Sequence, residues 1–134
     1  MAKLLLFNID APEKNTAIRL TAMRLGIGFR EIPPERQGQS LADLLTDSES
    51  TIPTPSESFS DEMLVMDSLS SEDFHFLLDT LRKNDQRIRL KAVVTDHNRS
   101  WSAERLHREL CAEADALEKR QRTIHKGTKT KGGR

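Results

Sequence analysis

The stretch KLLLFNIDAPE, residues 3–13, decides the fold, because an apolar run is followed at once by a helix start. The run is too short for a helix and is flanked by turn-forming residues, so it predicts a buried strand over residues 3–9. Asp10 can cap a helix, Pro12 falls in the first turn where its missing N–H costs nothing, and Glu13 completes a capping box. The first unit is therefore a strand followed by a helix.

The same alternation recurs three more times along the chain. Short apolar runs predict further strands over residues 27–32, 62–66 and 88–95, each followed by a helix that begins after a serine. Such alternation is typical of a mainly parallel sheet with helices on its faces. We predict an α/β fold with a four-stranded, mainly parallel sheet, helices packed on its faces and the βα unit repeated four times. A ferredoxin-like fold is the competitor, and it would need antiparallel neighbours in a βαββαβ order.

The length of 134 residues fits one domain, and the pattern places it over residues 1–118. The second and third predicted strands are separated by a polar stretch. Over residues 46–60, eight of fifteen positions are Ser or Thr and two are Pro. This composition predicts a polar Ser/Thr-rich insert, either a loop or a partly disordered segment.

The net charge of zero hides a division between two parts of the chain. Residues 119–134 contain seven Lys or Arg and no acid, which leaves 14 basic and 21 acidic residues in 1–118, a charge of −7. The last segment also lacks apolar residues at a regular spacing. We predict a basic disordered tail over 119–134.

Compartment and membrane association are read from the apolar runs and from the cysteine content. Cys111 is the only cysteine, which excludes an intramolecular disulfide and a multi-cysteine zinc site. The N-terminal apolar run is far shorter than a signal peptide core or a membrane span. We expect a cytoplasmic protein without a membrane partner.

The segment LKAVVT, residues 90–95, is followed by Asn98, Arg99 and Trp101. Together with EMLVM at 62–66, and with PPE at 33–35 before GQSL at 38–41, it resembles a small bacterial family catalogued only as a domain of unknown function. The resemblance covers residues 3–110, and the part from Lys91 to Trp101 is the most specific. It implies an α/β fold in the bacterial cytosol and brings no activity, cofactor or partner.

The predicted binding surface lies beyond the carboxyl ends of the strands, where open α/β sheets bind ligands. It consists of Asp67 after the third strand and of Thr95, Asn98, Arg99 and Trp101 after the fourth. Arg and Trp together are enriched where proteins bind each other. The structural alternative, which we favour, makes Trp101 a hydrophobic staple and gives Asn98 the role of holding the loop backbone. The leading hypothesis is a non-enzymatic regulatory or interaction module with an unknown protein partner.

Two other functions remain open from the sequence. The basic tail could bind nucleic acid without sequence preference by neutralising phosphates, since it has no aromatic residue to stack on bases. Alternatively, Asn8 and Asp10 after the first strand could meet Asp67 in a degenerate receiver-like phosphoacceptor. Against that reading, the first strand lacks an adjacent acidic pair and no fifth strand with a lysine is predicted.

Signals of catalysis and of metal binding are weak. His107 and Cys111 are four residues apart on one predicted helix, so both could contact one ion, but two ligands are too few for a structural zinc site. No glycine-rich phosphate loop and no nucleophile elbow occurs. We therefore predict no catalytic residues, no metal site and no cofactor.

Overall fold

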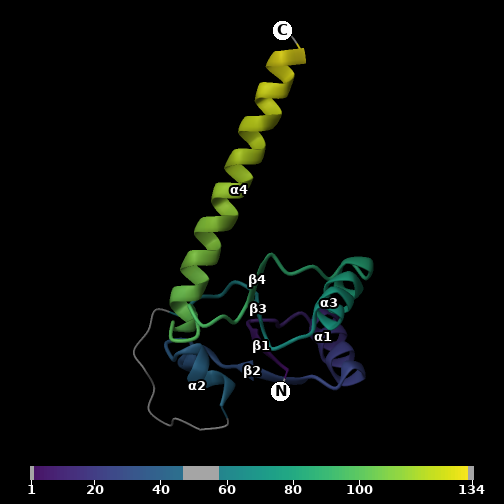
Figure 1. The fold of residues 1–134 in the computed structure, drawn as a ribbon, viewed down its shortest axis with the longest axis vertical. Coiled ribbons are helices and arrows are strands. Elements are labelled where there is room, and N and C mark those ends of the chain that lie inside the picture. The colour runs from purple at the N-terminus through teal and green to yellow at the C-terminus, as the bar shows by residue number, and fades with distance from the viewer. Residues whose placement is uncertain (1, 47–57, 133–134) are drawn as a thin grey trace.

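A computed structural model describes residues 2–46 and 58–132, with side chains up to residue 120 (Figure 1). The elements follow one another as β1 (Lys3–Phe7), α1 (Pro12–Leu25), β2 (Gly28–Ile32), the 3-10 helix η1 (Pro34–Arg36), α2 (Leu41–Leu45), β3 (Met63–Asp67), α3 (Ser71–Lys83), β4 (Leu90–Val93) and α4 (Ala103–Gly132).

The four strands form one open sheet in the order β2-β1-β3-β4. β1 and β2 are parallel, and so are β3 and β4, but the central pair of β1 and β3 is antiparallel, with Leu5 opposite Val65. The α/β class with a four-stranded sheet and helices is confirmed. The predicted mainly parallel arrangement needs correction, because the sheet is mixed and consists of two βαβ halves that meet along an antiparallel seam.

The antiparallel seam escapes prediction because β1 and β3 are apolar along almost their whole length. Residues 4–7 and 63–66 are all buried, so both faces of each central strand are covered. A strand that is buried on both faces carries no alternation of polar and apolar residues. Its sequence is therefore compatible with either direction relative to its neighbour.

Helices cover both faces of the sheet. Figure 1 shows α1 and α3 side by side on one face, with α2 and the start of α4 on the other. Successive residues of β1 point to opposite faces. Leu4 and Leu6 therefore belong to the apolar cluster under α1 and α3, and Leu5 and Phe7 to the cluster under α2 and α4.

Serine caps begin three of the helices. The side-chain oxygens of Ser40, Ser70 and Ser102 accept hydrogen bonds of 3.0–3.1 Å from backbone N–H groups three residues later, as the sequence predicts. The first helix differs. Its N-cap is Ala11, without a side-chain cap, so the predicted role of Asp10 is wrong.

Helix α4 continues well beyond the predicted end of the domain. Its backbone is helical from Ala103 to Gly132, where the sequence predicts a helix only to about residue 118 and then a disordered tail. Residues 119–132 contain no proline, and seven of these fourteen positions are Lys, Arg or Gln, which favour helix even without an apolar stripe. Figure 1 shows the distal part of α4 projecting away from the sheet. Within the described residues, no helix is both long and apolar enough to cross a membrane.

The predicted polar insert over 46–60 falls mostly on residues 47–57, outside the described part of the chain. Its last residues, 58–60, are described. Phe59 is buried in the cluster under α2 and α4, and its ring lies 5.8 Å from that of Phe7. The end of the insert is therefore part of the folded body.

Candidate functional site

The structure brings Asp67 next to the loop that follows β4. β3 and β4 are parallel, so their carboxyl ends lie at the same edge of the sheet. There, Nη2 of Arg99 lies 3.5 Å from Oδ1 of Asp67. The Asp67 side chain is 14% exposed and the Arg99 side chain is 45% exposed. Two of the five predicted site residues therefore form an ion pair at the predicted edge.

Thr95 and Asn98 shape the loop itself. The backbone N–H of Thr95 donates to Oδ1 of Asn98 at 2.8 Å, and the backbone N–H of Asn98 donates to Oγ1 of Thr95 at 3.1 Å. Nδ2 of Asn98 also donates to the carbonyl of Val93, at 3.1 Å. These contacts agree with the structural interpretation, in which Asn98 holds the loop backbone.

Trp101 fastens the loop to the rest of the molecule. Its half-buried ring packs against the cluster under α2 and α4, and the guanidinium of Arg105 lies 4.2 Å from the ring centroid. Its carbonyl accepts a hydrogen bond of 2.9 Å from the N–H of Leu41, at the start of α2. The tryptophan therefore behaves as an anchor at the start of α4, as the structural alternative predicts.

Asp67 and Arg99 lie at an open cavity of about 440 Å³, which we call the corner cavity. Its apolar lining includes Leu69, Phe74 and Val93. Val93, on the edge strand β4, has 46% of its surface exposed, which is high for a large apolar residue. The corner cavity thus combines apolar surface with one ion pair.

Asn8 and Asp10 do not join this corner. In the antiparallel register of β1 and β3, Lys3 lies opposite Asp67 and Phe7 lies opposite Met63. The carboxyl end of β1 is therefore at the opposite edge of the sheet from Asp67. The receiver-like arrangement requires these acids to converge, so its geometric premise is wrong.

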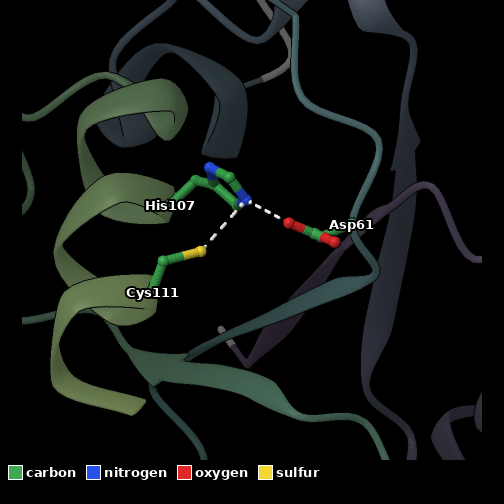
Figure 2. Close-up of side chains that lie close together, drawn as sticks. All are labelled: Asp61, His107 and Cys111. Carbon is green, nitrogen blue, oxygen red and sulfur yellow. Dashed lines mark hydrogen bonds and ion pairs between the residues drawn. The ribbon is translucent and has the colours of Figure 1, made fainter. Parts of the chain in front are cut away.

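A second group of polar side chains gathers at that opposite edge (Figure 2). Nε2 of His107 lies 2.9 Å from Oδ2 of Asp61 and 3.4 Å from Sγ of Cys111. His107 and Cys111 are one turn apart on α4, and Asp61 belongs to the segment just before β3. The three donor atoms all lie within 4.8 Å of one another. We call these residues the Asp–His–Cys cluster.

Two side-chain amides hold the segment that contains Asp61. The side chain of Gln37 is fully buried; its Oε1 accepts from the N–H of Phe59 at 2.9 Å and its Nε2 donates to the Phe59 carbonyl at 3.3 Å. Nδ2 of Asn8 donates to the carbonyls of Phe59 and Asp61, at 2.8 and 3.0 Å. The backbone around Asp61 is therefore fixed from two sides.

The ring of Phe59 fixes the histidine in turn. It stacks on the imidazole of His107 with a centroid distance of 4.1 Å and an angle of 6° between the planes. The sequence indicated that His107 and Cys111 share a helix face, but it missed Asp61, Gln37 and the stacking of Phe59. Asp61 is 46 residues away from His107, and no local pattern connects them.

The surroundings of Cys111 do not activate its thiol as a nucleophile. Burial raises the pKa of the Cys111 thiol, and the Asp61 carboxylate raises it further, against the opposing effect of Arg89. A nucleophilic cysteine needs a lowered pKa. In addition, Asp61 and Cys111 both contact Nε2 of His107, whereas a nucleophile–histidine–acid triad uses the two ring nitrogens separately.

Comparison with known proteins finds a family for part of the chain. Residues 62–117 match the model of a family described as Domain of unknown function (DUF3783). The predicted resemblance to a domain of unknown function is thereby confirmed. The match begins at residue 62, whereas the resemblance inferred from the sequence begins at residue 3. No curated protein and no solved structure matches the chain.

The matched segment contains most of the residues described above. It runs from just before β3 through α3 and β4 into the first half of α4. It therefore includes the whole loop after β4 with Arg99, as well as His107 and Cys111, and it begins one residue after Asp61. The match assigns no activity to these residues.

Proposed function

We propose that the domain is a non-enzymatic interaction module that binds a protein partner at the corner cavity. The observation that carries the proposal is the corner cavity itself, at the carboxyl ends of two parallel strands, which is the usual ligand position in open α/β sheets. Its volume of about 440 Å³ lies within the roughly 300–1,000 Å³ range of pockets that bind small ligands, so it has room for one or a few side chains of a partner.

The lining of the corner cavity indicates what the partner presents. Phe74 and Val93 offer apolar surface for an apolar side chain. The distance of 3.5 Å between Arg99 and Asp67 is at the long limit of a hydrogen bond, and the guanidinium is 45% exposed. The exposed guanidinium of Arg99 has N–H donors that can bind a carboxylate of a partner, and such charge-assisted hydrogen bonds are strong. The partner segment we propose carries one apolar and one acidic side chain.

Site-specific cross-linking in cells tests this proposal. A photoreactive amino acid is placed at position 93, in the corner cavity, and as a control at position 20, an exposed apolar site on α1. We expect a protein that cross-links from position 93 only. We also expect Arg99→Glu to reduce that cross-link at least tenfold, while Arg108→Glu, an exposed charge reversal on α4, leaves it unchanged. Identical cross-links from both positions, or insensitivity to Arg99→Glu, would contradict the proposal.

The projecting helix favours a second candidate, nonspecific binding of nucleic acid. Residues 119–134 carry seven bases and no acid, and positions 119, 122, 126 and 129 recur at the three- and four-residue spacing of one helix face. A segment that neutralises up to seven phosphates binds DNA with an affinity that falls steeply with salt. The logarithm of the binding constant then changes with the logarithm of the salt concentration with a slope of up to about −6.

Anisotropy titrations of random-sequence DNA duplex at several salt concentrations test this second candidate. A flat salt dependence, or equal binding by a chain that ends at residue 118, would remove the candidate.

A further inference from the structure

The Asp–His–Cys cluster offers three different metal-ligand atoms to one point. The contacts from Nε2 of His107 measure 2.9 Å to the carboxylate oxygen of Asp61 and 3.4 Å to the sulfur of Cys111. In a tetrahedral zinc site with bonds of ~2.0–2.3 Å, neighbouring donor atoms are roughly 3.3–3.7 Å apart. The two distances from Nε2 of His107 are therefore close to the spacing that a single ion would impose, and all three donor atoms lie within 4.8 Å of one another.

Hydrogen bonding makes only partial use of this arrangement. If Nε2 of a neutral His107 donates to Asp61, it cannot accept from the thiol of Cys111, and the sulfur takes part only as a weak acceptor at 3.4 Å. A cation between the three groups would bind the nitrogen lone pair, the carboxylate and a thiolate together. The two negative charges would balance a divalent ion.

We propose that Asp61, His107 and Cys111 form a zinc site with three protein ligands and a fourth position open to water. A thiolate, an imidazole and a carboxylate are the three ligand types that zinc takes in proteins, and the sulfur disfavours Mg²⁺ and Ca²⁺. Side chains around the cluster supply the support that metal ligands need. Phe59 stacks on the His107 ring, and Gln37 and Asn8 hold the backbone next to Asp61.

The zinc site would join two parts of the chain that are far apart in sequence. Asp61 lies before β3, while His107 and Cys111 lie on α4, 46 and 50 residues later. Bound zinc would therefore fasten the start of α4 to the edge of the sheet. Asp61 and Asp67 flank opposite ends of β3, so this site is separate from the corner cavity and does not depend on it.

Metal titration of the untagged full-length protein tests the zinc site. We expect one equivalent of Zn²⁺ to bind and to raise the melting temperature relative to protein in chelator. Substitution with Co²⁺ should give the near-ultraviolet thiolate-to-cobalt band and the visible bands of a tetrahedral centre. Cys111→Ser, His107→Ala and Asp61→Asn should each weaken binding more than tenfold. His75→Ala, which changes an exposed histidine on α3, should leave the affinity unchanged.

A second measurement does not depend on the stability of the variants. Zinc should protect Cys111 of the parent protein from alkylation, and chelator should remove the protection. The absence of a thiolate-to-cobalt band, alkylation that zinc does not slow, or equal zinc affinity in Cys111→Ser and the parent would each overturn the proposal.

Discussion

At the scale of single residues, Gln37 ties together three parts of the chain. Its side-chain amide bonds both backbone polar groups of Phe59, much as a neighbouring strand would. Its own carbonyl accepts a hydrogen bond of 3.0 Å from the N–H of Glu104, in the first turn of α4. One buried glutamine thus places the segment next to Asp61 and the start of the helix that carries His107.

Gln37→Leu should destabilise the fold. The apolar side chain leaves the buried N–H of Phe59 without its partner, at a cost of about 1–3 kcal/mol, while the Phe59 carbonyl keeps its hydrogen bond from Asn8. Urea denaturation measures the loss. Gln86→Leu, at a partly exposed turn position after α3, is the control and should change the free energy of unfolding little. Equal effects of both substitutions would contradict the role given to Gln37.

Trp101→Ala should also destabilise, because the ring packs against the core and lies at the start of α4. Replacing a buried tryptophan by alanine lowers the free energy of unfolding by about 3–5 kcal/mol. Because Trp101 is only half-buried, we expect a loss near the lower of these values. Arg105→Ala removes only the cation–π contact and should cost about 0.5–1 kcal/mol. A Trp101→Ala protein with the stability of the parent would contradict the anchoring role.

Cys111 should react with alkylating agents at a higher pH than an ordinary thiol. Burial and the Asp61 carboxylate raise its pKa, so the reactive thiolate forms only as the pH rises above the usual range. In the presence of chelator, the pH at which the alkylation rate reaches half its maximum should be higher for Cys111 than for a short cysteine peptide. Asp61→Asn removes one cause of the shift and should lower the midpoint. A midpoint that rises in this variant would show that the carboxylate does not act as described.

At the scale of elements, α4 joins a docked part to a projecting part. Arg89 pairs with Asp115 at 2.9 Å and with Glu118 at 3.3 Å. Both pairs are exposed, so their contribution to stability is small. The apolar residues that α4 packs against the cluster under α2 and α4, from Ala103 to Ala114, lie before these ion pairs. Of the apolar residues whose spacing predicts this helix, those at 106, 110 and 114 belong to the docked part, whereas Leu117 is 55% exposed.

Removal of residues 119–134 should leave the melting temperature within a few degrees of the parent. Among the side chains that the structure describes, those that pack the core precede position 119, and the removed segment has no regular apolar pattern in its sequence. Circular dichroism should show a loss of helical signal that corresponds to the missing part of α4. A large drop in melting temperature would mean that the distal helix is docked.

At the scale of the whole molecule, the sequence predicts the local elements well and their relative direction poorly. Alternating strands and helices, the serine caps and the edge that holds Asp67 and Arg99 could be read from spacing and composition. The direction of β1 relative to β3 could not, since both strands are buried on two faces. The Asp–His–Cys cluster was missed for a related reason. Its third member approaches the helix only through contacts between residues far apart in the chain.

The antiparallel pairing of β1 with β3 is the central claim, because it places Asn8 and Asp10 at the opposite end of the sheet from Asp67 and the corner cavity. Interproton contacts between the two strands, measured by NMR on isotope-labelled full-length protein, test it most directly. The account predicts backbone contacts that pair Lys3 with Asp67, Leu5 with Val65 and Phe7 with Met63. Contacts that pair Lys3 with Met63 and Phe7 with Asp67 would establish a parallel seam and contradict the account.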